Sequence, residues 1–283
     1  MSKGLHNPHG DFKSVEASRP DFDSSAKFHI TKVPSPSWTY GSGANEEYPA
    51  QPASHVSIDP HEEGRPVGFN YKLLISSVIP RPIAFVSTIS KDGKTQNLAP
   101  FSYFNFVNHD PPILVVGFAS GIANAKDTLR NVIDSESAVI NIISENFLEA
   151  ANATSVNAPY GVSEWDISGL TPVYDCETVK APRVKEAVFS VEVKLDSVRE
   201  FDSRATPGKK AGTMCTFEGT RFWVREDAIN EERNIVDPAV LRPVSRLGGI
   251  TYARVNQGME LPRADFQKDF GGEEAYNKLK KAE

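Results

Sequence analysis

Small polar residues recur in one stretch of the chain, at positions where strands are expected to begin or end. These residues are Ser87, Thr88, Asn97 and Ser102, and Pro100 lies among them. Proline has no backbone N–H, so some backbone groups next to it in a sheet are left without the usual hydrogen bond to a neighbouring strand. Hydroxyls, a carboxamide and free amides at a sheet edge offer hydrogen bonds to a flat molecule. The stretch therefore predicts a cradle for a planar ring.

A β-hairpin is expected to position these side chains. Residues 83–88 form a β-branched and aromatic run, Asp92-Gly93 is a tight-turn dipeptide, and residues 95–99 return. Residues 101–106 alternate aromatic and polar side chains, which indicates a further strand with two different faces. The continuous apolar run at residues 113–119 is typical of a buried strand.

The rest of the chain adds strands and a few helices. Asp127 is placed to cap a helix over residues 128–134. The other expected elements are a helix over residues 145–154 and strands over residues 138–143, 188–198 and 215–224. Many strands without regular βαβ alternation predict a mainly β (α+β) fold, a closed β-barrel with added helices. A glycine-rich dinucleotide fingerprint after a strand is missing from the sequence, which weighs against a Rossmann site.

Composition excludes several classes of function. The 283 residues are 39% hydrophobic and 24% charged, as in an ordinary globular protein of one or two domains. A net charge of -6 argues against nucleic acid as a partner. Cys176 and Cys215 are too far apart in sequence to predict a zinc or disulfide framework. The first residues lack a secretory signal, and no apolar run of about 18 residues predicts a membrane span. We expect a cytoplasmic protein without a bound metal.

The ends of the chain differ from its middle. Residues 1–68 are rich in proline and keep no helical or strand period, so we expect an extended arm. The arm is either a disordered tail or a segment that lies on its own subunit or a partner's, because Phe28 and Trp38 are costly to expose. Residues 69–254 hold the expected strands, and residues 255–283 form a charged, weakly helical tail.

Six separate motifs occur along the chain in a distinctive order and spacing. They are Arg81-Pro-Ile-Ala-Phe-Val-Ser-Thr88, Asp92-Gly93, Asn97-Leu-Ala-Pro-Phe-Ser-Tyr-Phe-Asn105, His109-Asp-Pro-Pro112, Lys126-Asp-Thr128 with Asn131, and Arg246-Leu-Gly-Gly249. This pattern resembles the flavin reductase-like family, whose members have the FMN-binding split-barrel fold. The resemblance covers residues 71–252. It implies a six-stranded antiparallel split barrel, a homodimer, and FMN held noncovalently near the dimer interface.

The resemblance also implies which residues bind the cofactor. A hydroxyl at a strand end and a lysine beside a helix N-terminus form an anion site, which assigns Ser102, Lys126 and Thr128 to the FMN phosphate. The isoalloxazine and ribityl groups are assigned to Ser87, Thr88 and Asn97, together with the backbone of Ala99, Pro100 and Phe101. Ser87, Thr88 and Asn97 alternatively satisfy strand ends and a turn.

Four further residues are weaker predictions. Arg81 and Arg246 are expected to approach the flavin or the nicotinamide phosphates, or alternatively to form surface or interface salt bridges. Tyr160 and Glu164 lie in a loop that the family tends to place near the exposed side of the ring, so they are expected to contact the substrate.

The function implied is transfer of a hydride from NADH or NADPH to the flavin. The cofactor carries the chemistry, so we expect no catalytic acid or base among the side chains. One alternative is an FMN oxidoreductase that reduces its own small organic substrate, such as an enone or a quinone, and the long arm favours it because a covered groove restricts flavin exchange. Another is a non-enzymatic protein that stores or senses FMN.

Overall fold

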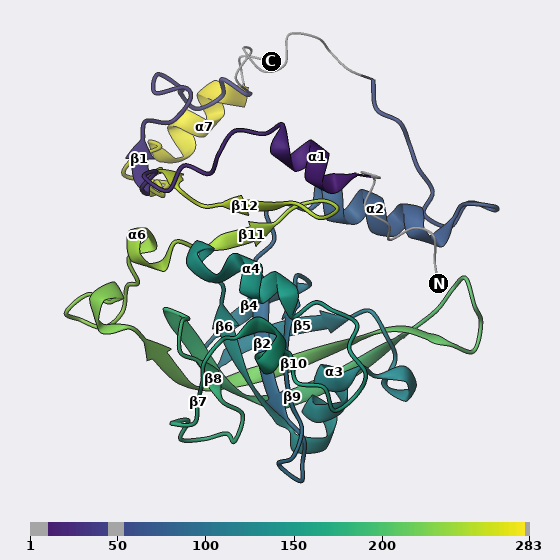
Figure 1. Ribbon diagram of the computed structural model, residues 1–283. Coiled ribbons are helices and arrows are strands. Elements are labelled where there is room, and N and C mark those ends of the chain that lie inside the picture. Colours follow the sequence, from purple (N-terminus) through teal and green to yellow (C-terminus); the bar gives the residue numbers. More distant parts are fainter. Residues whose placement is uncertain (1–10, 45–53, 281–283) are drawn as a thin grey trace. The chain divides into compact units, whose positions relative to one another are not determined.

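The computed structural model describes residues 11–44 and 54–280, which form two compact units (Figure 1). In the described part of the chain, unit 1 comprises residues 11–26 and 66–255, and unit 2 comprises residues 27–44, 54–65 and 256–280. Residues 1–10 and 45–53 of the expected arm, and residues 281–283 of the expected tail, lie outside the described residues.

Unit 1 is built on a seven-stranded antiparallel sheet in the order β3-β2-β6-β9-β10-β5-β4. Its strands are β2 (Ala84–Ile89), β3 (Gln96–Phe101), β4 (Phe104–His109), β5 (Pro112–Phe118), β6 (Ser137–Ile142), β9 (Phe189–Asp202) and β10 (Lys210–Val224). Pairs joined by short turns, such as β2 with β3 and β9 with β10, are neighbours in the sheet. The hairpin predicted from residues 83–99 is therefore confirmed.

The sheet curls on itself. β2 and β5 are separated by three strands in the sheet order, yet Val86 and Val116 belong to one buried cluster. Phe101 of β3 meets Phe118 of β5 edge to face, with ring centroids 4.8 Å apart. A flat sheet would hold these residues far apart, so curvature brings them together.

The prediction of a mainly β fold is confirmed, but that of a closed, six-stranded barrel is wrong. Seven strands form the sheet, and β3 and β4 are its two ends in the described ladder. The chain turns after β3 and again at Asp110 and Pro111, which adds β4 as an outer strand beside β5. The result is an open, curled sheet in the described residues.

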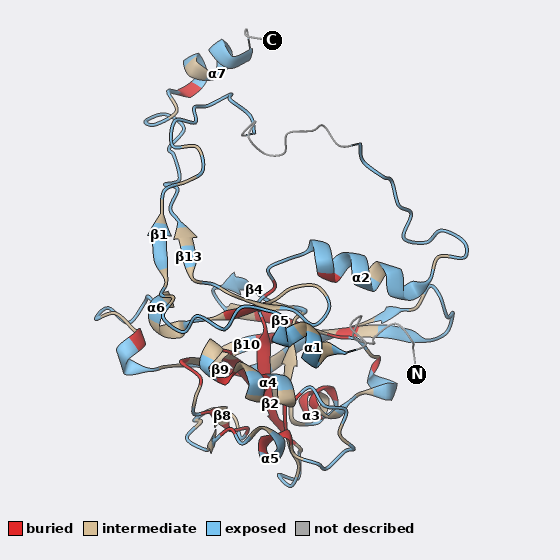
Figure 2. Ribbon diagram, turned by 45° about the horizontal axis from the view of Figure 1, so that its top comes forward, coloured by how far each residue is buried: buried red, intermediate tan, exposed pale blue. Residues whose placement is uncertain are grey.

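Two buried clusters flank β2, and Figure 2 shows burial concentrated in the central strands. Ala84 and Val86 face the inner cluster, whereas Phe85 faces the second cluster with Phe147 and Trp165. All six residues of β2 are buried as a consequence. A strand covered on both faces loses the polar alternation of a half-exposed one.

Short helices and strands complete unit 1. The helices are α1 (Phe12–Ala17), α2 (Val67–Ser77), α3 (Asp127–Ser135), α4 (Leu148–Ala153), α5 (Glu164–Ser168) and α6 (Pro238–Leu241). The 3-10 turns are η1 (Ile122–Asn124), η2 (Glu145–Phe147) and η3 (Glu226–Ala228), and the short strands are β7 (Pro172–Val173), β8 (Arg183–Val184), β11 (Val244–Arg246) and β12 (Tyr252–Arg254). None of the described helices is long and apolar enough to cross a membrane.

The helix predicted after Asp127 exists as α3, but the predicted cap is wrong. Lys126 occupies the N-cap position, Asp127 is the first helical residue, and no side-chain cap hydrogen bond forms. A carboxylate in the first turn still interacts favourably with the positive end of the helix dipole. The first amides of α3 therefore remain without a capping side chain.

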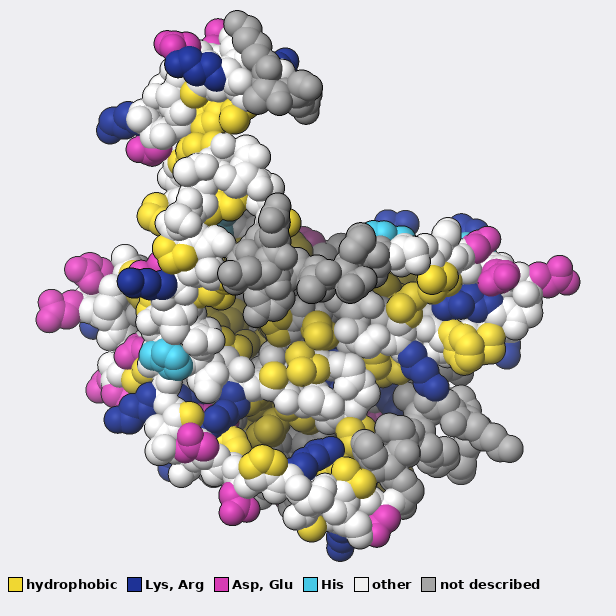
Figure 3. Space-filling view, turned by 90° about the horizontal axis from the view of Figure 1, so that it is seen from above, with side chains coloured by type: hydrophobic (Ala, Val, Ile, Leu, Met, Phe, Trp, Pro, Cys, Tyr) yellow, Lys and Arg dark blue, Asp and Glu magenta, His cyan; other side chains and the backbone are white. Residues whose placement is uncertain are grey.

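Unit 2 joins segments from both ends of the chain. β1 (His29–Thr31) pairs in parallel with β13 (Gln257–Met259), and α7 (Gly272–Lys280) follows. Trp38 packs edge to face on Tyr40, and Tyr40 on Phe270, with centroids 5.7 and 4.7 Å apart. Parts of the expected arm and of the expected tail thus fold with each other. Across the face seen in Figure 3, charged side chains of both signs are interspersed with hydrophobic ones.

Candidate functional site

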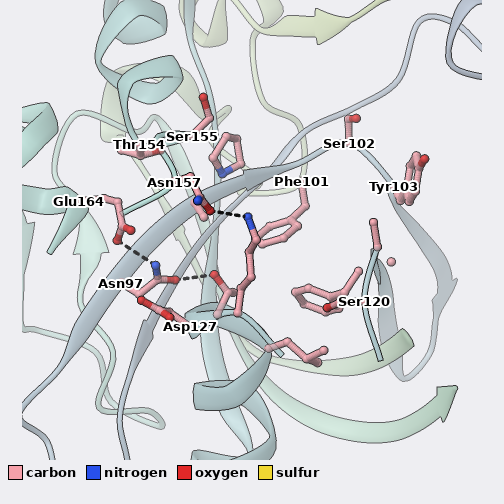
Figure 4. Close-up of a pocket in the computed structure, with 18 of the residues that line it drawn as sticks. Asn97, Phe101, Ser102, Tyr103, Ser120, Asp127, Thr154, Ser155, Asn157 and Glu164 are labelled. Atoms are coloured by element: carbon pink, nitrogen blue, oxygen red, sulfur yellow. Dashed lines mark hydrogen bonds between the residues drawn. The ribbon is translucent and has the colours of Figure 1, made fainter. Parts of the chain in front are cut away.

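Unit 1 contains a pocket of about 390 Å³, within the usual range for small-molecule sites of about 300 to 1,000 Å³. The end of β3 and the turn after it form one wall, and the end of β5 forms another. The N-terminus of α3, the loop after α4 and the first residue of α5 complete it (Figure 4). Tyr71 and Ile75 of α2 also line this pocket.

The N-terminus of α3 offers an anion site. The first amides of a helix have no intrahelical acceptor, and the helix dipole places partial positive charge there. Lys126 stands at this end and donates a 3.0 Å hydrogen bond from Nζ to Asn157 Oδ1. Asn157 is neutral, and no carboxylate of the described residues forms an ion pair with Lys126. The lysine charge is therefore available to an anionic ligand such as a phosphate.

A buried hydrogen-bond network connects three elements beside this anion site. Asn97 of β3 donates from Nδ2 to Glu164 Oε2 at 2.8 Å, and its Oδ1 accepts from the hydroxyl of Thr128. Leu98 N donates to the same glutamate oxygen at 3.3 Å. Asn97, Thr128 and Glu164 are each no more than 5% exposed. The carboxamide of Asn97 is thus held in one orientation.

The carboxyl group of Glu164 lies where a negative charge is unfavourable. Burial raises its pKa above the usual range, the hydrogen bonds from Leu98 and Asn97 lower it in part, and the charge of Asp127 raises it further. No lysine or arginine in the described part of the chain forms an ion pair with it. Carboxyl groups with raised pKa values in a pocket are recurrent features of functional sites.

The structure brings most of the predicted residues together in this pocket. The predicted residues that line it are Asn97, Ala99, Pro100, Phe101, Ser102, Lys126, Thr128 and Glu164. Tyr71, Tyr103, Ser120 and Asn157 also line it and were not among the predicted site residues. Tyr103 lies within a family motif, which was a usable signal. Tyr71 carried none, because nothing in the sequence brings α2 to β3.

Arg81 and Arg246 lie outside the lining of this pocket. Arg81 donates from Nη1 to Ile75 O at 2.6 Å and Val78 O at 2.8 Å, and from Nη2 to Leu247 O at 2.9 Å. It therefore anchors the C-terminal end of α2. Arg246 donates to Gly249 O at 2.9 Å and its guanidinium lies 4.3 Å from the centre of the Tyr252 ring.

Ser87, Thr88 and Tyr160 are likewise outside the lining. Ser87 and Thr88 are fully buried in β2, and Thr88 Oγ1 accepts from Asn131 Nδ2 at 3.0 Å. Tyr160 is 48% exposed, and the guanidinium of Arg130 lies 4.4 Å from its ring centre. This contact ties the loop after α4 to α3.

Unit 1 is a mainly β domain whose pocket joins the uncapped N-terminal end of α3 to walls of polar and aromatic side chains. A model of the flavin reductase-like domain family matches residues 75–242. The chain belongs to the flavin reductase-like family. Membership supports a flavin as the cofactor and an oxidoreductase as the class of protein.

Individual proteins show the same relationship. An uncharacterised protein from Aquifex aeolicus is 41% identical over 187 residues, which cover 65% of this chain and 89% of that protein. Nitrilotriacetate monooxygenase component B from Bacillus cereus has a TM-score of 0.69 at 35% identity, covering 74% of this chain and 100% of that one. The 2-nitrobenzoate 2-nitroreductase from Pseudomonas fluorescens has a TM-score of 0.65 at 29% identity, covering 77% and 100%.

Proposed function

We propose that this protein binds FMN in the pocket and transfers a hydride to it from NADH or NADPH. The observation that carries the proposal is the anion site at the N-terminus of α3, where Lys126 stands beside uncapped helix amides at the edge of a pocket within the family domain. A phosphate monoester matches such a site in charge and in hydrogen-bond acceptors.

The donor set of the pocket fits the other parts of FMN. We assign the backbone of Ala99, Pro100 and Phe101 and the fixed carboxamide of Asn97 to the ring and ribityl chain, since all line the pocket. The hydroxyl of Ser102 lines the same wall and is assigned to the phosphate end. The bound flavin would supply the electron-accepting ring, and the protein binds, orients and shields it.

A second function is favoured by one comparison. The similar structure of a 2-nitrobenzoate 2-nitroreductase raises the proposal that this chain passes electrons from FMN to a small organic acceptor of its own. Steady-state turnover separates the two. Saturation by added FMN as a substrate supports a flavin reductase, whereas flavin that stays bound through many turnovers supports the acceptor-reducing enzyme.

We further propose a homodimer. Phe106 and Val107 on the end strand β4 are 68% and 59% exposed, and large exposed apolar side chains on a sheet edge are typical of association surfaces. Sedimentation equilibrium of the purified chain tests this. A single species with the mass of one chain at micromolar concentration would contradict it.

The first experiment is an absorbance spectrum of the purified protein, followed by anaerobic addition of NADH and then NADPH. A flavin spectrum that bleaches on addition of either nucleotide is expected. A flavin spectrum that persists with both would favour the non-enzymatic FMN-binding protein. A colourless protein that cannot be reconstituted with FMN would overturn the proposal.

A further inference from the structure

Glu164 is the first residue of α5 and forms part of the pocket wall. Its side chain is 5% exposed and lines the pocket, and two donors from β3 converge on one of its oxygens. Figure 4 shows the carboxyl group directed at Asn97, whose other end is held by Thr128. The orientation of both Asn97 and Thr128 therefore depends on Glu164.

The pocket carries more negative than positive charge. Its charged lining residues are Lys126, Asp127 and Glu164, one positive and two negative when all are ionised. A phosphate monoester adds about -1.5 to -2 charges near neutral pH. A ligand that fills the pocket also displaces water from the carboxyl group, which disfavours its charged form further. The charge of the ligand and the loss of water thus both favour the protonated form of Glu164.

Several titratable groups near α5 are exposed to water. Asp166 on α5 itself, Glu149 on α4 and Arg130 on α3 are exposed, and Tyr160 in the connecting loop is 48% exposed. β3 carries no charged side chain. Asp127, the first residue of α3, and Lys126 at its N-cap are the charged residues that share the pocket with Glu164. Glu164 is therefore the most deeply buried of the charged residues that line the pocket.

We propose that Glu164 takes up a proton when a phosphate-bearing flavin binds, and that in both protonation states it positions Asn97 and, through it, Thr128. This inference rests on the proposed binding of FMN. A neutral carboxyl group keeps a carbonyl oxygen that can accept from Asn97 and gains an O–H donor. Protonation therefore removes the unfavourable charge without releasing the network. Binding of FMN becomes linked to pH through this one side chain.

Isothermal titration calorimetry of FMN into the full-length protein tests the linkage. The titration is repeated in buffers of different ionisation enthalpy between about pH 6.5 and 8, above the second phosphate pKa of about 6. Net proton uptake is expected for the wild type, with affinity that falls by up to about tenfold per pH unit. In Glu164→Gln, which mimics the neutral carboxyl group, uptake should vanish and the affinity should become flat with pH.

Asp166→Asn is the matched control, because it removes an exposed carboxylate from the same short helix. It should keep the proton uptake of the wild type. Equal uptake in the wild type and Glu164→Gln would overturn the inference while leaving FMN binding intact. Absence of FMN binding by the wild type would instead overturn the proposed function.

A second measurement covers the case in which Glu164→Gln does not fold. Infrared difference spectra of the wild-type protein with and without FMN should show a new protonated-carboxyl band that shifts in D2O. Absence of such a band at a pH where affinity is falling would overturn the inference. Its presence, together with proton uptake by calorimetry, would support it.

Discussion

Lys126 is the residue on which the phosphate assignment depends most directly. Lys126→Ala should weaken FMN binding, because a charge-assisted hydrogen bond contributes about 1.5 to 3 kcal/mol, or roughly a tenfold to hundredfold change in Kd. Lys126 is exposed, so the difference should shrink as salt screens the charge. Flavin fluorescence titration at low and high salt measures both effects.

A lysine in the hairpin turn provides the control for that titration. Lys94 is exposed and paired with Asp92 at 3.6 Å, so Lys94→Ala should leave the Kd unchanged. An unchanged Kd for Lys126→Ala in low salt would contradict the assignment of the FMN phosphate to the N-terminus of α3.

Glu164 should also make the free energy of unfolding depend on pH. Burial raises the pKa of its carboxyl group in the folded state above the usual range of a glutamate. The stability that this group contributes is therefore fully present below the unfolded pKa and is lost as the pH rises through the folded pKa. Glu164→Gln should flatten this part of the profile, so the variant gains stability relative to the wild type as the pH rises.

Urea denaturation at several pH values between about 4 and 8 measures this effect. Asp166→Asn serves again as the control, since its carboxylate is exposed. Parallel pH profiles for the wild type and Glu164→Gln would contradict the raised pKa.

The sequence predicted residue types at the pocket better than it predicted burial. Asn97, Lys126 and Thr128 line the pocket as their motifs suggested. Ser87 and Thr88 stand in an equally polar motif, yet β2 is covered on both faces and both hydroxyls are fully buried. The hydroxyl of Thr88 accepts its hydrogen bond from Asn131 on α3, so the partner of this strand residue is set by packing from a distant segment.

At the scale of elements, Arg81 holds α2 against the pocket. Its guanidinium reaches three carbonyl groups, those of Ile75, Val78 and Leu247. A lysine has a single ammonium group and cannot reproduce this fork. Arg81→Lys should lower the free energy of unfolding by about 2 kcal/mol, since hydrogen bonds from charged groups are worth about 1.5 to 3 kcal/mol each. Urea denaturation measures the loss.

Hydrogen exchange then locates the effect of Arg81→Lys. Amides of α2 should exchange faster, whereas those of β9 should not change. Arg225→Lys is the control, because Arg225 forms an exposed ion pair with Asp227 and such pairs contribute little. Equal stability of Arg81→Lys and the wild type would mean that α2 is held by other contacts.

Elements that are local in sequence were the most predictable. The hairpin of β2 and β3 follows from the β-branched and aromatic run at residues 83–88 and the tight turn at Asp92-Gly93, and α3 lies where a helix was expected after Asp127. Residues 188–198 alternate polar and apolar side chains in the sequence. β9 nevertheless has no continuous exposed face, because Ser190, Val191, Glu192 and Val193 are all buried. Glu192 is fully buried, and donors from Thr178 and Trp223 satisfy it. Its partners come from other segments, which no periodicity reveals.

At the scale of the whole molecule, pairing between distant segments was beyond the sequence. β1 and β13 are three residues each and lie more than two hundred residues apart, but they pair in parallel. Strands this short carry almost no pattern of their own. Likewise, the sheet has a seventh strand only because β4 pairs with β5 at its end. The curl of the sheet and the composition of unit 2 therefore required the structure.

Unit 2 should open more readily than the sheet of unit 1, because a two-stranded pairing is marginal in water and depends on its side-chain contacts. Tyr40 connects Trp38 to Phe270 and so links the two segments of this unit. Tyr40→Ala should speed hydrogen exchange in residues 29–44 and 257–280 and leave the seven-stranded sheet unchanged. Val56→Ala, at a residue of unit 2 that is 82% exposed, should change neither. If Tyr40→Ala also loosened the sheet of unit 1, the two units would unfold as one, and the division of the chain into separate units would fail.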